Sequence, residues 1–400
     1  MPKKTLKISS RAINTQLSPI RKFVPLLQLA KKKGLNVFEL HIGQPDLKTP
    51  SQILNKIKNF NGKIIRYTPS NGMPEVQSAW KKYFKGFDIN FNESEIVVTI
   101  GGSEAIFFAL SAICDPKEEV IVFEPFYTNY NGIGSVASVK LVPVRTFLQT
   151  GFHLPDKKSI ERKISKKTKA ILICNPSNPT GTVYSKKELQ MIVDIASKHN
   201  LFILADEVYR EFVYDGQKHF SIMDFKKAHN RAVILDSISK RFSACGLRIG
   251  CLASKNKDLI AGVTKFAQAR LSLPMVEQIA AVPLLLSSKA YTRKIAKEYK
   301  KRRDAVYEGL QKIPGIQCLK PKGAFYIIVK LPVKDSEDFT RWLLTKFSYN
   351  NETVMLAPAA GFYASKGLGK DEVRIAFVLS ASKLKQAMHV LKIALERYKK

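Results

Sequence analysis

Residues 232–250 read AVILDSISKRFSACGLRIG, and the rest of the chain can be interpreted outward from this stretch. Its β-branched opening predicts a buried strand. A lysine that follows such a strand loses part of its hydration, so its amine can stay neutral and attack a carbonyl group. The hydroxyls of Ser237 and Ser239 and the guanidinium of Arg248 are donors that suit a phosphate monoester. An aldehyde that carries a phosphate is pyridoxal 5'-phosphate (PLP), so the stretch predicts a PLP site with Lys240 as the reactive amine.

The composition is that of a globular protein with an unusual charge. The 400 residues are enough for a large core and two domains. Lysine and arginine number 66 against 33 acidic residues, a formal net charge of +33. The basic residues are scattered along the whole length, so we expect a diffuse basic surface that attracts anionic substrates, and a nucleic-acid partner is disfavoured.

Neither a membrane segment nor a disulfide framework is expected. The longest apolar run, Ile279 to Leu286, is too short to span a bilayer, and the N-terminus leads into no signal core. The five cysteines have no CxxC spacing, which favours reduced thiols and no metal site. The expected location is the cytoplasm.

Apolar strand patterns alternate with helical patterns over most of the chain. Strands are predicted at 95–99, 120–123, 139–144, 170–174, 201–205, 232–235 and 249–253, with helices at 74–84, 101–113 and 186–198. This alternation predicts an α/β fold with a mostly parallel seven-stranded sheet between helices. Ligands bind beyond the carboxyl ends of such strands. The residues that follow these ends include Gly102, Tyr127, Asn178, Asp206 and Lys240.

The pattern changes near residue 288. Charged helices at 291–311 and 382–398 flank apolar runs at 323–329 and 373–377, which predicts a smaller α+β domain. We therefore expect a large PLP-binding domain at 46–287. Residues 1–45 and 288–400 would form the small domain that closes over the substrate.

Several short motifs occur in a characteristic order. They are Gly43-Gln44-Pro45-Asp46, Tyr67 with Gly72, Asn175-Pro176-Ser177-Asn178-Pro179-Thr180-Gly181, Asp206-Glu207-Val208-Tyr209, the Lys240 segment and Arg374. Together they resemble the class I/II aminotransferases of fold-type I PLP enzymes, most closely the aspartate/aromatic subgroup. The resemblance runs from about Ser18 to the C-terminus.

The resemblance implies a role for each motif residue. Lys240 would be the Schiff-base lysine and proton shuttle, Asp206 would pair with the pyridinium nitrogen, and Tyr209 with Asn178 would bond the phenolic oxygen. Tyr127 would stack on the ring. The phosphate would be held by Gly102, Ser103, Glu104, Ser237, Ser239 and Arg248, the first three largely through backbone N–H groups.

The resemblance also implies the substrates and the assembly. Arg374 would clamp the α-carboxylate of an L-amino acid or a 2-oxo acid, beside Gly43 and Asn178. Tyr67 would reach the phosphate of the neighbouring subunit, which implies a homodimer with shared sites. One residue departs from the pattern: Ala359 follows Pro358 where many relatives have glycine.

Three functions remain open from the sequence. The first is transfer of an α-amino group to a 2-oxo acid by a ping-pong mechanism. The second is β- or γ-elimination by a PLP-dependent lyase on the same fold. The third is nucleic-acid binding by a basic protein on an enzyme scaffold.

Overall fold

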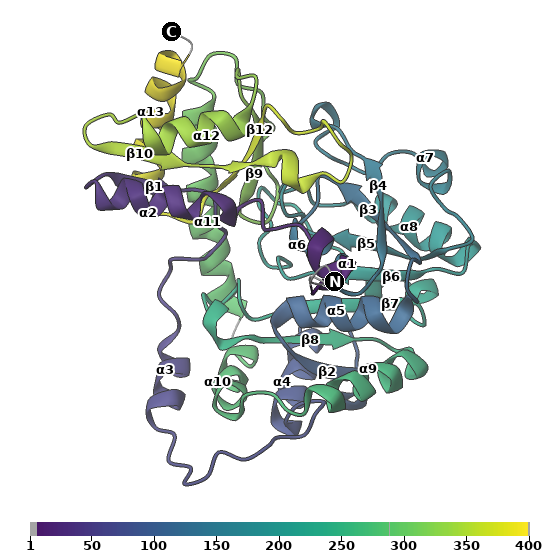
Figure 1. Ribbon diagram of the computed structural model, residues 1–400. Coiled ribbons are helices and arrows are strands. Elements are labelled where there is room, and N and C mark those ends of the chain that lie inside the picture. The colour runs from purple at the N-terminus through teal and green to yellow at the C-terminus, as the bar shows by residue number, and fades with distance from the viewer. Residues whose placement is uncertain (1–5, 288, 399–400) are drawn as a thin grey trace, which may run out of the picture.

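A computed structural model describes residues 6–287 and 289–398, and it is built around one seven-stranded sheet (Figure 1). The strand order is β2-β8-β7-β6-β5-β3-β4. The strands are β2 (Ile96–Ile100), β3 (Glu119–Glu124), β4 (Lys140–Arg145), β5 (Thr168–Cys174), β6 (Phe202–Asp206), β7 (Ala232–Ser237) and β8 (Ile249–Ala253). Only β8 is antiparallel to its neighbours β2 and β7, so the sheet is mostly parallel, as predicted.

Helices cover both faces of the sheet because its strands are apolar on both faces. Alternate residues of one strand enter different cores; Ile171 and Ile173 of β5 face one core, and Ala170 and Leu172 face the other. The first face packs against α4 (Pro74–Lys85), α7 (Lys157–Glu161), α8 (Lys186–Lys198) and α10 (Met275–Leu285). The second packs against α5 (Gly101–Ile113), α6 (Asn129–Val136) and α9 (Lys257–Arg270).

The residues at the start of α8 explain why this helix begins where the sequence predicts. The Ser185 hydroxyl accepts a hydrogen bond from the backbone N–H of Glu188, and the Glu188 carboxylate accepts one from the backbone N–H of Ser185. This capping box satisfies two N–H groups that a helix start leaves free. The predicted bounds of α5, α8 and β8 agree with the structure.

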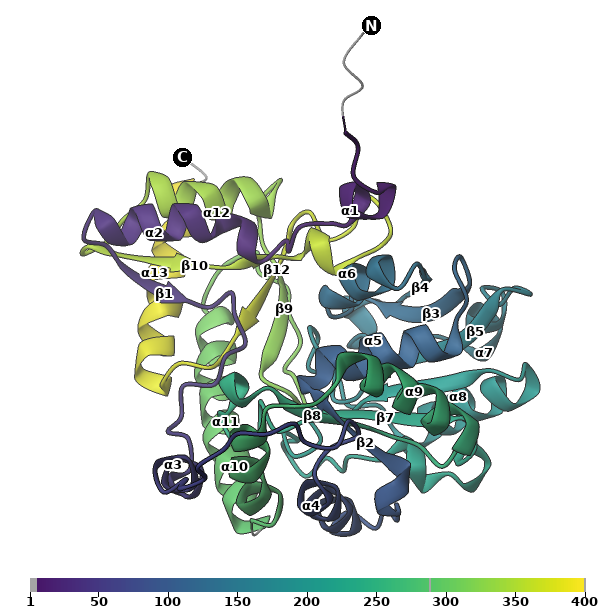
Figure 2. The same cartoon turned by 60° about the horizontal axis from the view of Figure 1, so that its bottom comes forward.

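A second group of elements packs beside the main sheet (Figure 2). It holds a three-stranded antiparallel sheet of β11 (Ala357–Pro358), β12 (Glu372–Ala376) and β9 (Tyr326–Lys330). A parallel pair joins β1 (Asn36–Glu39) to β10 (Glu352–Met355), so the N-terminal segment pairs with a strand more than 300 residues later. Four helices complete the group, namely α2 (Val24–Lys32), α11 (Lys289–Leu310), α12 (Ser336–Thr345) and α13 (Ala381–Tyr398).

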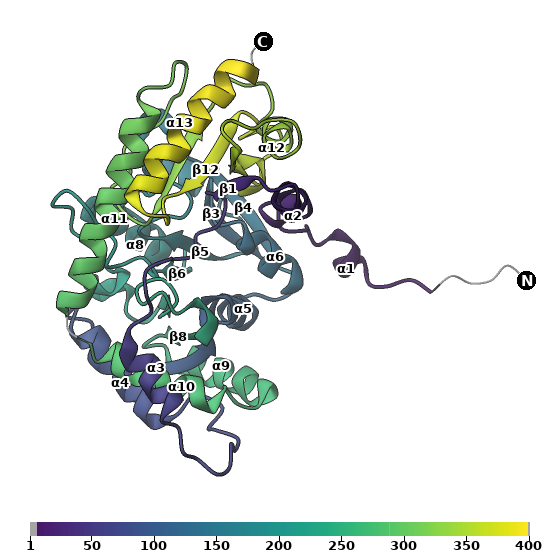
Figure 3. The ribbon, with the colours of Figure 1, turned by 90° about the vertical axis from the view of Figure 1, so that its left-hand side faces the viewer.

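The long helices α11 and α13 lie side by side, and α2 packs on α12 (Figure 3). Two short helices lie outside these layers. The first, α1 (Ser10–Asn14), packs on α6, where Arg11 donates to the carbonyl of Val136. The second, α3 (Ser51–Lys58), packs on α10. Among the described residues, no helix is both long and apolar enough to cross a lipid bilayer.

Gly250 allows the start of β8 to lie close to the backbones of β7 and of the start of α5. A Cβ atom at this position would lie 2.7 Å from the carbonyl oxygen of Asp236 and 2.7 Å from the backbone carbon of Gly101. Both neighbours are backbone atoms of β7 and of the start of α5, so they cannot rotate away. The start of β8 therefore requires glycine.

We expect Gly250→Ala to destabilise the protein by about 1–3 kcal/mol, because the added methyl group would push the start of β8 away from β7 and from the start of α5. The matched control is Gly262→Ala in α9, where a Cβ would meet nothing within 4 Å. There alanine should stabilise the helix by up to about 1 kcal/mol. Urea unfolding measures both changes, and an equal stability of the two variants would contradict this reading of Gly250.

Candidate active site

A cavity of about 140 Å³ lies at the carboxyl edge of the main sheet. The predicted residues that line it are Gly102, Ser103, Tyr127, Asn178, Asp206, Tyr209, Ser237, Ser239, Lys240 and Arg248. Asp206 ends β6 and Ser237 ends β7, and the others except Arg248 follow β2, β3, β5, β6 or β7 within a few residues. Arg248 precedes β8, whose reversed direction puts its N-terminal end at the same edge. These residues lie together because the carboxyl ends of the parallel strands meet at this edge of the sheet.

The amine of Lys240 lies inside this cavity. Its Nζ donates a hydrogen bond to the carbonyl oxygen of Gly43, 2.9 Å away. Desolvation, with the charges of Arg374 and Arg248 nearby, lowers the pKa of Lys240. A lowered pKa increases the fraction of neutral, nucleophilic amine.

Asp206 is the buried acid of the cavity. Desolvation raises the pKa of its carboxyl group to about 6. The hydroxyl of Tyr130 donates to Oδ2 of Asp206 at 2.8 Å and favours the ionised form. Sequence reasoning missed Tyr130, which comes from the unpredicted helix α6.

The opposite end of the cavity can bind a phosphate. The hydroxyls of Ser237 and Ser239 lie 2.7 Å apart. The start of α5 presents N–H groups that have no partner within the helix. Arg248 adopts a left-handed backbone with φ of 55°, and its guanidinium packs so closely on Gly101 that a Cβ there would lie 2.5 Å from Nη2. Hydroxyls, helix N–H groups and a guanidinium form the donor set that PLP's phosphate needs.

Arg374 from β12 is buried beside the same cavity. Its Nη1 donates to Oδ1 of Asn178 at 3.0 Å and its Nη2 to the carbonyl of His41 at 2.6 Å. The rings of Tyr326 and Phe362 lie 4.4 and 4.9 Å from the guanidinium carbon. In the described parts of the chain no carboxylate pairs with Arg374 and its Nε has no hydrogen-bond partner, although a buried cation is costly without a counter-charge. A substrate carboxylate would meet this need.

Besides Arg374, which lies beside the cavity, three predicted residues do not line it. The carboxylate of Glu104 accepts hydrogen bonds from the backbone N–H of Ile100 and from Arg270, so only its own backbone N–H remains available to a phosphate. Gly43 touches the site through its carbonyl, which Lys240 reaches. Tyr67 is 80% exposed and is not among the residues that line the cavity.

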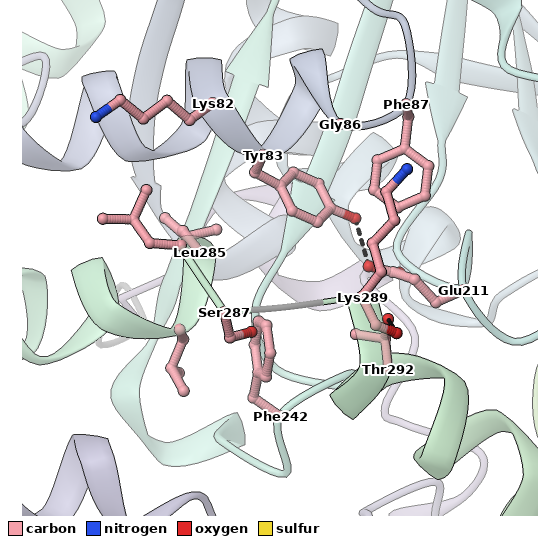
Figure 4. Close-up of a pocket in the computed structure, with 12 residues that line it drawn as sticks. Lys82, Tyr83, Gly86, Phe87, Glu211, Phe242, Leu285, Ser287, Lys289 and Thr292 are labelled. Carbon is pink, nitrogen blue, oxygen red and sulfur yellow. Dashed lines mark hydrogen bonds between the residues drawn. The ribbon is translucent and has the colours of Figure 1, made fainter.

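A buried charge network beneath the cavity was not predicted. Asp236 is fully buried and pairs with Arg241, and Arg241 in turn lies 3.1 Å from Glu211. Glu211 accepts a hydrogen bond from Tyr83 in a separate outer cavity of about 300 Å³ (Figure 4). None of the predicted site residues lines this outer cavity. Glu211 in its wall, however, belongs to the network that anchors the Lys240 segment.

The class of molecule follows from this arrangement, because a desolvated lysine, a buried acid and donors for a phosphate meet at one edge of a mostly parallel sheet. Arg374 adds a buried guanidinium that no carboxylate of the described chain neutralises. These are the features of a PLP-dependent enzyme. The comparisons with known proteins refine this class. The family model for aminotransferase class I and II matches residues 36–391. The chain belongs to this family and is a PLP-dependent aminotransferase.

Relatives and solved structures cover nearly the whole chain. An aspartate aminotransferase of Pyrococcus horikoshii is 33% identical over 396 residues, with 97% of each chain covered. An aromatic-amino-acid aminotransferase 2 of Thermococcus litoralis is 31% identical and covers 98% of this chain and 100% of its own length. The structure of an alanine aminotransferase from Pyrococcus furiosus has a TM-score of 0.89 at 29% identity, with 98% of this chain and 100% of that chain covered. The family predicted from the motifs is confirmed.

We expect the contribution of Asp206 to the stability of the cofactor-free protein to fall as the pH rises from about 4 to about 6. The unfolded Asp206 carboxyl titrates near pH 4, whereas burial raises the pKa of the folded group to about 6. Folding is therefore favoured where this group is protonated, and the loss on ionisation is about 3 kcal/mol. Asp206→Asn should remove this contribution. Urea unfolding of both proteins across this range gives the difference, and a difference that does not change with pH would contradict the prediction.

Proposed function

We propose that this aminotransferase moves the α-amino group of an L-amino acid to a 2-oxo acid by a ping-pong mechanism at Lys240. The observation that carries the proposal is the position of the Lys240 amine in one cavity with Asp206, with Arg374 beside it. The aminotransferases named above act on aspartate, aromatic amino acids and alanine according to their names. The donor of this chain is to be found among such amino acids.

Each residue would act on the cofactor or on the substrate through the atom it presents to the cavity. PLP supplies an aldehyde that condenses with amines and a pyridinium ring that accepts electrons. Lys240 would hold and return the α-proton, and Asp206 would keep the ring nitrogen protonated. Tyr209 would donate to the phenolic oxygen. Asn178 would join it through its amide NH₂, because its carbonyl already accepts from Arg374.

The remaining contacts would orient the two reactants. Tyr127 would stack on the ring. Gly102, Ser103, Ser237, Ser239 and Arg248, with the backbone N–H of Glu104, would hold the phosphate. Arg374 would bind the α-carboxylate in a bidentate pair near Gly43.

We also propose that residues 46–287 form the PLP-binding domain, and that residues 1–45 with 288–400 form a domain that closes over the substrate. A hydrophobic core formed mainly by α11, α13, β9 and β12, which Cys174, Tyr209, Phe212 and Tyr214 join from residues 46–287, supports this division, as does the pairing of β1 with β10. A cytoplasmic location agrees with the five free cysteines.

The alternative function is a PLP-dependent lyase, since the cofactor-binding residues would serve both reactions. The two functions differ in stoichiometry. An aminotransferase without an acceptor stops after one turnover, whereas a lyase continues to release 2-oxo acid and ammonia.

We expect the PLP-loaded protein, given an amino acid donor alone, to release about one equivalent of 2-oxo acid per site and no ammonia, because the amino group stays on the cofactor. Lys240→Ala should lose the absorbance of the covalently bound cofactor and at least about 10³-fold in rate. Lys294→Ala, at an exposed lysine of α11, is the matched control and should keep both. Continuous ammonia release by the wild-type protein would favour the lyase.

We further propose that the active unit is a homodimer with shared sites. Tyr67 and its neighbours Ile64 and Ile65 expose 80%, 66% and 68% of their surface in one subunit. Apolar side chains exposed together in this way are typical of interfaces. In the dimer, Tyr67 would reach the phosphate of the neighbouring site.

We expect Ile65→Asp to shift the protein from dimer to monomer and to weaken PLP binding, because a buried unpaired carboxylate disfavours the interface. Leu319→Asp is the matched control, since Leu319 is 47% exposed and lies at a distant cavity lined by Lys320 and Lys322. Sedimentation velocity and PLP titration measure both effects. A variant that stays dimeric with unchanged PLP affinity would contradict the shared-site proposal.

A further inference from the structure

Tyr326 of β9 was assigned no role above, yet it lines the active-site cavity. Its side chain is 2% exposed, and it belongs to the apolar strand Tyr326–Lys330. The Tyr326 side chain contacts three parts of the site whose residues are far apart in the sequence.

The first contact is with the substrate-side guanidinium. The guanidinium carbon of Arg374 lies 4.4 Å from the centre of the Tyr326 ring, within the range of a cation–π interaction. The ring of Phe362 lies 4.9 Å from the same carbon. The two rings and the bonds to Asn178 and His41 limit the orientations that Arg374 can adopt.

The second contact is with the cofactor side. The hydroxyl oxygens of Tyr326 and Tyr209 lie 2.9 Å apart and share one hydrogen bond. Each hydroxyl has one proton, so the proposed donation of Tyr209 to the phenolic oxygen requires Tyr326 to be the donor within this pair. When Tyr326 donates, the single proton of the Tyr209 hydroxyl remains free for another acceptor.

The third contact is with the loop that Lys240 reaches. A Cβ on Gly43 would lie 1.8 Å from the hydroxyl oxygen of Tyr326, so this position must be glycine for the ring to stay. The carbonyl of the same Gly43 accepts from Lys240. The hydroxyl of Tyr326 therefore also limits where this loop can lie.

We propose that Tyr326 is a positioning residue that directs the Tyr209 hydroxyl toward the phenolic oxygen of PLP and holds the Arg374 guanidinium for the substrate carboxylate. The inference rests on the roles proposed above for Tyr209 and Arg374. It predicts that the hydroxyl and the ring of Tyr326 have separable effects.

Two variants separate these effects. Tyr326→Phe removes only the hydroxyl. The phenolic oxygen then loses an oriented donor for its negative charge, so the pH midpoint at which the bound cofactor changes colour should rise by about half a pH unit. The KM for the amino donor should stay within about twofold. The titratable or charged neighbours of Tyr326 are Arg374, Tyr209, Tyr127 and Cys245, and all are unchanged in this variant.

Tyr326→Leu also removes the ring. The KM for the amino donor, and the inhibition constant of its 2-methyl analogue, which has no α-hydrogen, should rise about tenfold. The matched control is Tyr299→Phe, a buried tyrosine that stacks on Phe325 and whose hydroxyl has no hydrogen-bond partner among the residues that the structure describes. Its midpoint and both constants should equal those of the wild-type protein.

An unchanged colour midpoint in Tyr326→Phe, or an inhibition constant within twofold of wild type in Tyr326→Leu, overturns the proposal. Equal midpoint shifts in Tyr326→Phe and Tyr299→Phe overturn it as well, because the effect would then be general to buried hydroxyls. A wild-type protein that shows no cofactor colour with PLP would instead refute the proposed function.

Discussion

The site depends on one buried carboxylate in the wall of its cavity. Asp236, near the end of β7, pairs with Arg241 and lies 3.6 Å from Arg210. Because Arg241 directly follows Lys240, the ion pair ties the turn that carries the reactive amine back to its own strand. Removing one partner of such a buried pair costs about 3–5 kcal/mol, since the other charge stays desolvated. The ion pair between Asp236 and Arg241 therefore fixes the position of Lys240.

The same burial acts on both titratable groups of the cavity, in opposite directions. It lowers the pKa of Lys240 and raises that of Asp206, so each group loses part of its charge in the cofactor-free protein. Arg374 and Arg248 bring two guanidinium groups, which in the described chain donate to carbonyl and amide oxygens and not to carboxylates. A cavity with this balance favours anions at both ends, which suits a phosphate at one and a carboxylate at the other.

The main sheet could be predicted because its signals are local. An apolar run of five to seven residues marks a strand, and the capping box at Ser185 marks the start of α8. The reversed direction of β8 could not be predicted, since periodicity is the same in both directions. Helix α6 was missed because its sequence NYNGIGSV is poor in helix formers, and α10 because it contains Pro283. Tertiary packing stabilises both.

Some residues of the candidate site could likewise be predicted from the sequence, and others could not. Asp206, Asn178 and Lys240 were predictable because a sheet edge collects the ends of its parallel strands. Tyr130 and Tyr326 were not, because each acts through a hydroxyl contact across 76 or 117 residues of sequence. Four of the five residues of β9 are buried, so no polar alternation distinguishes Tyr326 from a core aromatic residue. A functional hydroxyl on a strand buried on both faces leaves no trace in hydrophobic periodicity, and only the geometry of its partners reveals it.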